Sequence, residues 1–492
     1  MFFSRTISSI KNHWRELLTA LFLAASFFPF RHVMNFQNAS RFGWYIEPLA
    51  ISIYAADFIF IAVVFIFRKK LLEEFKKDWI LLSAILVFIL AQSARNSDPA
   101  LGGYMFLRFL QFAILLILFS IVTKSKTTIK LFCVTLMTIG VLQSALVVYQ
   151  VTNSHSLGLK LLGEQTIDIS KAGVAKVDLT SSKLLRGYGT LPHPNILAGL
   201  LTITIAANLY LIQAKTTKPI TTGGLESQSL RSARLSRAEA NPNYKNVWRL
   251  LRFARKDDVF SNSQSNAGLW TLYCLLLIQI VGMVLSFSRA GFLSLTILLL
   301  LFFVPQTKRG TLNLKKWGIC ILLALVFLAL INSLTGGAIY QRILPPKTDI
   351  SLSERTFLFR ESWNIFRHNI ILGTGNGQYI INYIDRVPAG TRIEKWQYDF
   401  PHNVVVQSCS ELGFLGFLIF ALLVFTLIKY NTKNWRHFWY SVVIISPYLM
   451  FDHFLLTNQS GRILLVLSLT LLPKILESGS VELGDKKGNQ TF

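Results

Sequence analysis

Long apolar runs recur along the whole chain and alternate with short polar stretches that are rich in lysine and arginine. A helix needs about 20 largely apolar residues to cross the hydrocarbon core of a bilayer. Only 15% of the residues are charged, whereas soluble globular proteins carry about 25%. The pattern therefore predicts an all-α polytopic membrane protein and excludes a water-soluble globular fold.

The apolar runs predict about twelve membrane-spanning helices, with a margin of about one or two because the third and the last runs are short. The predicted spans are 16–30, 46–67, 79–92, 103–122, 128–151, 191–213, 267–287, 290–305, 317–334, 404–427, 436–451 and 460–473.

Basic segments between the runs predict the orientation of the chain. Segments 68–78, 123–130, 306–316 and 428–436 carry several lysines or arginines each and fall on one side of the predicted topology. The positive-inside rule places that side, and with it both termini, in the cytoplasm. The net charge of +25 then fits loops that meet anionic membrane lipids. No nucleic-acid-binding pattern accompanies it, so we expect no nucleic-acid partner.

This topology divides the chain into six segments. They are transmembrane helices in 1–213 with an extracytoplasmic loop 152–190, a basic cytoplasmic loop 214–266 for which we predict disorder, central transmembrane helices in 267–334, a large extracytoplasmic loop 335–403, C-terminal transmembrane helices in 404–473, and a cytoplasmic tail 474–492. Loops as long as 335–403 are uncommon without a role. We therefore expect this loop to be catalytic, and its sequence predicts a helix over 353–368.

The four cysteines all lie inside apolar runs: Cys133, Cys274, Cys320 and Cys409. A disulfide framework or a zinc site would need cysteines in loops at suitable spacing. We therefore predict no disulfide, no metal site and no cofactor.

Polar residues that can carry chemistry gather on the predicted outer side. Each has a structural alternative, because an arginine can extend to the membrane interface, a histidine can cap a helix, and an acid can pair with a base. As a group they suit one reaction: arginines present a fork of donors to phosphate oxygens, and a histidine accepts a proton near neutral pH. The group is Arg186, His193, Arg289, Arg355, His402, Asp452 and Arg462.

Several short motifs follow one another along the chain. In order, they are His193-Pro194-Asn195, Ser288-Arg289-Ala290-Gly291, Arg355 followed by Trp363, Gly373-x-Gly375-x-Gly377, His402-Asn403, and Glu411-x-Gly413 with Gly416. In this order and placement they resemble the O-antigen ligase and polymerase superfamily of bacterial envelope glycosyltransferases. The resemblance is strongest from about residue 185 to 420.

The resemblance implies a GT-C-like fold and a glycan transfer from undecaprenyl diphosphate to an acceptor hydroxyl, without a metal, at the outer face of the bacterial inner membrane. By match, His402 is the general base, and Arg289 and Arg355 hold the diphosphate with Arg186 as a third cation. The implied supporting residues are His193, Asn403, Asp452 and Arg462. The implied partners are the lipid-linked glycan donor, a glycan or lipid-linked acceptor, and membrane lipids.

Three alternatives stay open at this stage, and one of them is a ligase of the same class that glycosylates proteins. A polymerase of the same superfamily would use a second lipid-linked glycan as its acceptor, and the motifs separate it poorly from a ligase. A flippase or exporter of lipid-linked glycans is a different class, which predicts charged residues deep in several spans. The spans contain few such residues beyond Asp57, Arg108 and Glu411, and no internal repeat suggests a transporter of two similar halves.

Overall fold

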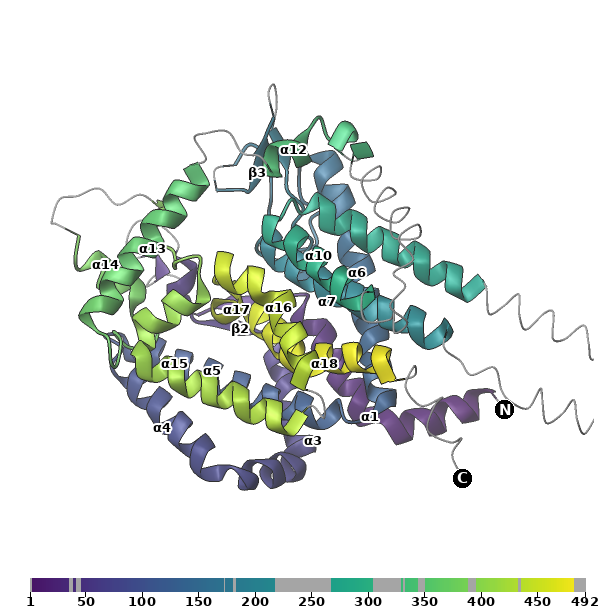
Figure 1. Cartoon of the computed structure of the whole chain (residues 1–492), viewed down its shortest axis with the longest axis horizontal. Coiled ribbons are helices and arrows are strands. Elements are labelled where there is room, and N and C mark those ends of the chain that lie inside the picture. Colours follow the sequence, from purple (N-terminus) through teal and green to yellow (C-terminus); the bar gives the residue numbers. More distant parts are fainter. Residues whose placement is uncertain are drawn as a thin grey trace, which may run out of the picture.

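The computed structural model describes residues 2–34, 39–40, 46–171, 173–179, 183–216, 267–303, 329–330, 332–343, 350–387, 395–431 and 435–481. These parts are mostly helical (Figure 1). Six of the described helices are long and apolar enough to cross a membrane. They are Pro99–Val122, Lys126–Asn153, Pro194–Thr216, Ala267–Leu285, Val404–Thr426 and Gln459–Glu477. Trp79–Ala94 and Arg289–Phe302 are shorter apolar helices. The predicted loop 214–266 lies outside the described residues after Thr216, as does most of span 317–334.

Two helices form the centre of the bundle. In α7 (Pro194–Thr216) and α18 (Gln459–Val481), 94% of the most apolar window is buried, against 28% in Ala267–Leu285 and in Val404–Thr426. Around them lie α1 (Phe2–Ser26), α5 (Pro99–Val122), α6 (Lys126–Asn153), α10 (Arg289–Phe303) and α16 (Trp435–Phe451). Gly199 helps α7 approach its neighbours, because a Cβ there would lie 3.2 Å from the Phe454 ring. Small residues at such contacts are typical of packing between membrane helices.

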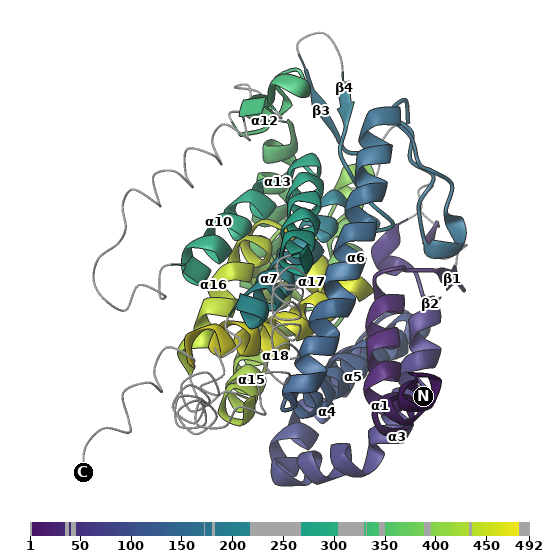
Figure 2. The same ribbon diagram turned by 90° about the vertical axis from the view of Figure 1, so that its right-hand side faces the viewer.

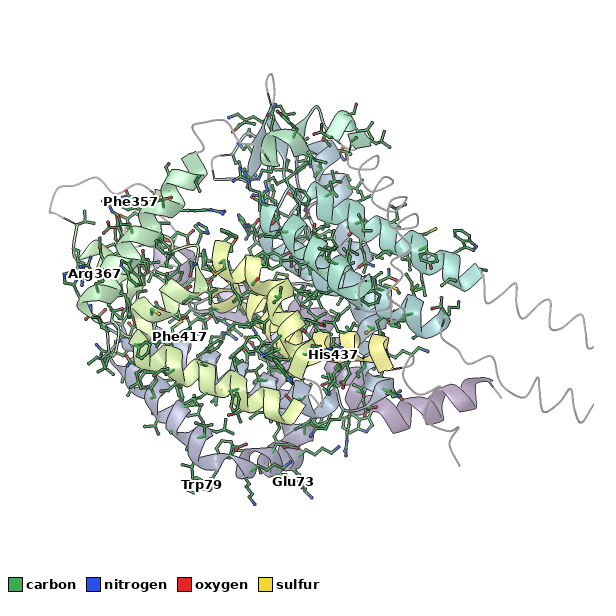
Figure 3. All side chains as sticks on the ribbon, in the orientation of Figure 1. Glu73, Trp79, Phe357, Arg367, Phe417 and His437 are labelled. Carbon is green, nitrogen blue, oxygen red and sulfur yellow. The ribbon has the colours of Figure 1, made fainter. Side chains whose placement is uncertain are left out.

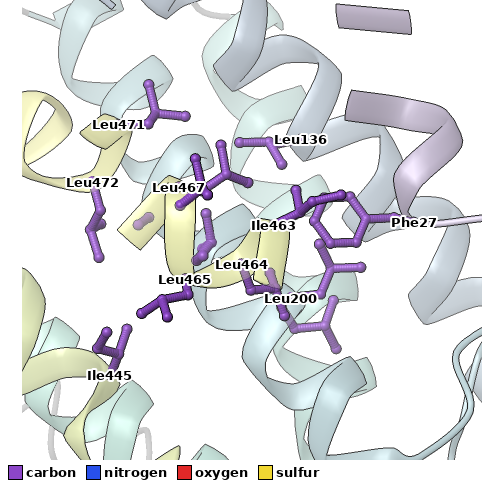
Figure 4. Close-up of a cluster of buried hydrophobic side chains, with 14 of the residues drawn as sticks. Phe27, Leu136, Leu200, Ile445, Ile463, Leu464, Leu465, Leu467, Leu471 and Leu472 are labelled. Carbon is purple, nitrogen blue, oxygen red and sulfur yellow. The ribbon is translucent and has the colours of Figure 1, made fainter. Parts of the chain in front are cut away.

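Aliphatic side chains of α18 fill the space between the other helices. Figure 4 shows them meeting Phe27, which follows α1, Leu136 of α6, Leu200 of α7 and Ile445 of α16. Each buried side chain of this size contributes about 1.5–3 kcal/mol in water. Between helices in lipid that drive is absent, and close packing takes its place.

Short strands lie outside the bundle. Strand β1 (Arg31–Val33) pairs antiparallel with β2 (Ser52–Tyr54), and β3 (Lys176–Asp178) pairs with β4 (Lys183–Leu185). The β3–β4 hairpin projects beyond the helices at the same end as α12 (Ala338–Ile343) (Figure 2). The predicted second span, 46–67, begins too early: residues 47–49 form a 3-10 turn with Pro48, residues 52–54 form β2, and the helix α3 starts only at Ala55 and ends at Lys77. A strand that pairs with β1 therefore replaces the first part of the predicted span.

Helices of the large loop stand beside the bundle. They are α13 (Ile350–His368), α14 (Tyr379–Ile384) and the short turn Lys395–Tyr398, all close to α15 (Val404–Asn431). The expected helix 353–368 is confirmed and starts three residues earlier, at Ile350. Figure 3 places Phe357 and Arg367 on this helix, above Glu73 and Trp79, which lie at the lower edge of the view.

The glycine-rich segment after α13 inserts into a break in α15. Gly413 has φ 68° and ψ −172° within α15, so the helix is interrupted there. The N–H groups of Thr374 and Gly375 donate to the carbonyl oxygens of Ser410 (3.0 Å) and Glu411 (2.8 Å). These donors are used within the protein, and the glycines allow two backbones to touch. The segment therefore fastens the large loop to α15 and does not present those two N–H groups to a phosphate.

Candidate functional site

A buried chain of polar side chains joins three segments that are far apart in the sequence. The guanidinium of Arg186 donates from Nη2 to Oδ1 of Asn195 (2.8 Å), and Nδ2 of Asn195 donates to Oδ2 of Asp452 (2.5 Å). Arg186 also donates from Nε to the carbonyl oxygen of Ser286 (3.0 Å). All three side chains are buried, with residue exposures of 4%, 5% and 3%. Because α7 begins at Pro194, Asn195 lies in its first turn and bridges the cation to the anion.

His402 lies against the end of this chain. Its Nδ1 is 3.8 Å from Oδ1 of Asp452, within ion-pair range but too long for a hydrogen bond. This nitrogen is buried and has no hydrogen-bond partner among the described residues. The His402 side chain is 21% exposed, so the rest of the imidazole stays accessible to a reactant. Asp452 therefore lies beside the buried Nδ1 of His402. A carboxylate in this position can orient a histidine that acts as a general base.

The charge state of Asp452 follows from its neighbours. Burial alone raises the pKa of a carboxyl group. Here His402, His453 and His193 outweigh burial and hold the pKa of Asp452 well below its usual value. Asp452 is therefore an anion at neutral pH, and it balances part of the positive charge around it.

Arginines crowd around Arg186. Burial, followed by repulsion from Arg342 and Arg355, lowers the pKa of Arg186 to about 9. Nη1 of Arg355 donates to the carbonyl oxygen of Phe451 (3.4 Å), which brings α13 to the end of α16. Asp452 is the one carboxylate among the leading influences on Arg186. A site with this excess of positive charge favours a polyanion.

Arg289 and Arg342 hold each other's segment in place. Nε of Arg289 donates to the carbonyl oxygen of Arg342 (2.7 Å), and Nε of Arg342 donates to that of Phe287 (3.1 Å). Phe287 is fully buried at φ 47°, a conformation that a bulky residue rarely adopts. Such strain persists only where the surroundings enforce it, and it is common at functional sites. The segments that carry these two cations are therefore fixed before any ligand arrives.

The motif Ser288-Arg289-Ala290-Gly291 has a structural explanation. Oγ of Ser288 accepts the N–H of Gly291 (3.2 Å) and so caps the start of α10. A Cβ at Gly291 would lie 2.8 Å from the Cβ of Ala198, so glycine lets α10 approach α7 closely. The motif thus sets Arg289 at the helix N-terminus, next to the segment that carries Arg186 and Asn195.

A second histidine pair lies beside His402. Nε2 of His453 is 3.2 Å from Oδ1 of Asp399, and the rings of His402 and His453 are 5.2 Å apart. Burial lowers the pKa of His453, but Asp399 and Asp452 outweigh burial and raise it. Burial likewise raises the pKa of Asp399, yet His453 lowers it to about 2. The raised pKa of His453 and the lowered pKa of Asp399 both favour the ionic form of this pair, which lies beside Asp452.

The other predicted supporting residues have separate positions. Nδ1 of His193 accepts the N–H of Asn195 (3.2 Å), and His193 is close enough to Asp452 to lower its pKa. Asn403 caps α15, because its Oδ1 accepts the N–H of Val406 (3.0 Å) and its Nδ2 donates to the carbonyl oxygen of Met450 (3.2 Å). Arg462 does not join the group: it donates to the carbonyl oxygen of Leu456 (2.8 Å) and lines a different cavity.

Sequence analysis assigned no role to four members of this site: Asn195, Arg342, Asp399 and His453. From the sequence, Asn195 stands out only as part of a motif, and His453 only as a polar residue of the last predicted outer turn. His453 follows Asp452 directly, and Asp399 precedes His402 by three residues, so proximity to the selected residues was the available signal. Nothing in the local sequence marks Arg342, which joins the group through the fold of α12.

Three of these side chains have the geometry to hold a metal ion. Asp399, His402 and His453 each offer one ligand atom, and these atoms lie within 4.8 Å of one another. Imidazole and carboxylate donors suit a divalent transition metal. Asp399 and His453 already satisfy each other as an ion pair. The expectation of a reaction without a metal remains a prediction.

The fold defines a helical protein with several apolar helices that are long enough to cross a membrane, and the site lies at one end of its bundle. Residues 274–421 match the family model described as O-Antigen ligase. This match confirms the resemblance to the O-antigen ligase and polymerase superfamily, and with the apolar helices it identifies a membrane protein with a ligase- or polymerase-type function in general. No curated protein matches the chain.

The matched region carries only part of the site. Arg289, Arg342, Arg355 and His402 lie within it, whereas Arg186, Asn195 and Asp452 lie outside. The tertiary structure joins the two groups through the contact of His402 with Asp452.

Proposed function

We propose that the protein transfers a glycan from undecaprenyl diphosphate to an acceptor hydroxyl, without a metal, at the extracytoplasmic face of the bacterial inner membrane. The main support is the arginine group around Arg186. Burial, followed by repulsion from Arg342 and Arg355, lowers the pKa of Arg186, and an incoming diphosphate relieves that repulsion. Arginine forks match phosphate oxygens in geometry and charge.

The proposed reaction is a direct displacement at the anomeric carbon of the donor. His402 accepts the proton of the acceptor hydroxyl, whose oxygen forms a bond to that carbon. The bond between this carbon and the diphosphate oxygen breaks, and undecaprenyl diphosphate leaves with the electron pair. Arg186, Arg289 and Arg355 stabilise the negative charge of the leaving group. Asp452 stabilises the protonated imidazole, as its position beside Nδ1 supports.

The proposed orientation places His402 outside the cell together with its neighbours Asp452, Asp399 and His453, which we call the His402 group. Glu73 of the basic segment 68–78 lies at the lower edge of the view, below Phe357 of α13 (Figure 3). This separation agrees with the positive-inside rule. The six segments predicted from the sequence, with 335–403 as the catalytic loop, belong to the same proposal.

A direct test uses purified protein, undecaprenyl-diphosphate glycan and candidate acceptors, with release of undecaprenyl diphosphate as the readout. We expect His402→Ala to abolish transfer. Arg289→Ala should slow transfer by about 10²–10³-fold, as the loss of one preorganised donor to a developing anion does. Full activity in both variants contradicts the proposed mechanism.

Arg360→Ala is the matched control. The Arg360 side chain is 76% exposed on α13, five residues after Arg355, and we expect its loss to leave transfer nearly unchanged. Offering an acceptor lipid and a second donor molecule in parallel separates a ligase from a polymerase, because each uses one of them as its acceptor.

A further inference from the structure

A cavity lies between α4 (Trp79–Ala94), α5 and α15, apart from the arginine group at Arg186. Its empty space is about 1210 Å³, which includes the part that is open to solvent. Its lining includes neither His402 nor any of Arg186, Arg289 and Arg355. The proposed transfer reaction therefore leaves this cavity without a role.

One end of the cavity is polar and positively charged. Arg31, Arg108 and Arg462 line it, together with Tyr54 and Tyr104. The guanidinium of Arg108 lies over both tyrosine rings, at 5.2 Å and 4.9 Å from their centroids.

The three arginines differ in whether a carboxylate neutralises their charge. Arg108 is paired with Asp57 through two hydrogen bonds of 2.7 Å and 2.9 Å, and Arg31 is paired with Glu47. Arg462 is the exception: among the described residues it has no carboxylate within ion-pair distance, and its partners are the neutral oxygens of Leu456 (2.8 Å) and Gln459 (3.3 Å).

The uncompensated cation is also enclosed. Nε of Arg462 is buried and has no hydrogen-bond partner in the described part of the chain. Arg462 stands in the first turn of α18, where the helix dipole adds further positive potential. Arg462 as a whole is half-buried, and an ionisable residue of this kind within a membrane span is by default a candidate for a binding site.

The other carboxylate of the lining is held by the backbone. Oε1 of Glu411 accepts the N–H of Tyr379 (3.4 Å), which begins α14. Glu411 thus supports the junction of α14 and α15, as a structural role predicts, and it does not neutralise Arg462.

The remainder of the lining is apolar and extends along α15. Ile85 and Ile89 of α4 and Phe109 and Phe112 of α5 face four residues of α15: Leu412, Ile419, Phe420 and Leu423. Beyond the break at Gly413, the lining of α15 runs from Gly416 to Leu423, over which a helix rises about 10 Å at 1.5 Å per residue. That length is about a third of the roughly 30 Å hydrocarbon core, so this part of the cavity suits the upper part of a lipid tail in one leaflet.

We propose that this cavity is a binding site for an anionic amphiphile, whose headgroup pairs with Arg462 and whose tail lies along α4, α5 and α15. A phosphate-bearing headgroup on an acyl or isoprenoid tail has the required chemistry. Phe400 also lines the cavity, and its ring lies 5.7 Å from that of His453. The wall of the cavity therefore reaches the ring of His453, which lies beside His402. The proposal does not depend on the transfer reaction.

Lipid binding to the detergent-purified full chain, followed by native mass spectrometry, tests the proposal. The probes are phosphatidylglycerol, undecaprenyl monophosphate, zwitterionic phosphatidylcholine and inorganic phosphate. We expect wild-type protein to prefer an anionic lipid over phosphatidylcholine by about tenfold or more, because hydrogen bonds to charged groups contribute about 1.5–3 kcal/mol. A preference for phosphatidylglycerol identifies a bulk membrane lipid, and a preference for undecaprenyl monophosphate identifies a polyprenyl lipid.

Two variants separate the headgroup from the tail. Arg462→Gln removes the charge and should abolish the preference for anionic lipid. Ile419→Trp fills the apolar part and should weaken binding of both anionic lipids. Leu418→Trp is its matched control: Leu418 is adjacent on α15, is 42% exposed and is not part of the lining, so its binding should equal that of the wild type.

Three results would overturn the proposal: unchanged lipid preference in Arg462→Gln, unchanged binding in Ile419→Trp, or displacement of the lipid by inorganic phosphate at equal concentration. His402→Ala should retain full lipid binding, so the outcome here is independent of whether the proposed transfer mechanism holds.

Discussion

At the scale of single residues, the site is organised by charge balance. Arg186, Asn195 and Asp452 form a buried chain in which an amide separates the cation from the anion. A direct ion pair would neutralise Arg186, whereas the amide leaves its charge available to a ligand. His453 and Asp399 provide a second, self-contained pair beside His402.

The His453–Asp399 pair makes a testable contribution to stability. The pKa of His453 is raised, so its contribution is fully present below the unfolded value of about 6.5 and is lost as pH rises through the folded pKa. The pKa of Asp399 is lowered to about 2, so its contribution is present above about 3.9 and is lost as pH falls. The pair therefore stabilises most between about pH 4 and 6.5.

Thermal unfolding of the detergent-solubilised protein at pH 6 and pH 9 measures this contribution. We expect His453→Gln to lower the melting temperature more at pH 6 than at pH 9. Equal losses at the two pH values would show that the ion pair contributes nothing. The Asp399 side chain is 40% exposed, so solvent screens the pair and the effect is modest.

At the scale of elements, the break in α15 determines how the large loop is attached. The N–H groups of Phe414 and Leu415 donate to the carbonyl oxygens of Ile370 (2.8 Å) and Ile371 (3.2 Å), which continue the contacts of the glycine-rich segment. Nη2 of Arg95 adds a hydrogen bond to the carbonyl oxygen of Gly373 (3.0 Å) from the end of α4. Three elements thus meet at one junction, and α13 with Arg355 is held by it.

Gly413→Ala tests this junction. Gly413 has φ 68°, and an added Cβ would collide with the backbone at Ile371 and Gly373. Backbone strain of this kind costs about 1–3 kcal/mol before the collision is included, so we expect a lower melting temperature and reduced transfer. The control is Gly103→Ala on α5, where nothing lies within 4 Å of the added Cβ; it should be neutral or stabilising by up to about 1 kcal/mol. Equal melting temperatures for the two variants would contradict this account of the junction.

At the scale of the whole molecule, the proposed orientation has its own test. Reporter fusions after Gly377 should report an extracytoplasmic location, and fusions after Ser229 a cytoplasmic one, because the basic loops retain their side in the cytoplasm. If both fusions report the same side, or if the two locations are reversed, the His402 group cannot face outward as proposed.

Hydropathy predicted the helices that face lipid or the bundle centre with good bounds. The predicted spans 103–122 and 128–151 correspond to α5 (Pro99–Val122) and α6 (Lys126–Asn153). The hydropathy prediction was wrong for the first part of span 46–67. An apolar run has the same hydropathy whether it forms a helix or a strand beside a proline. The pairing of β2 with β1 is a contact between distant segments and leaves no periodic signal.

Apolar length and short motifs are local properties, so the sequence alone was enough to predict a helical membrane protein that resembles the O-antigen ligase and polymerase superfamily. Which polar residues meet could be learned from the tertiary structure alone. It brought Asp452 and Asn195 to His402 and Arg186, added Arg342, Asp399 and His453, and placed Arg462 at a separate cavity. The physical reason is that charge balance and hydrogen bonding depend on distances across the bundle, which helix packing sets and local sequence does not encode.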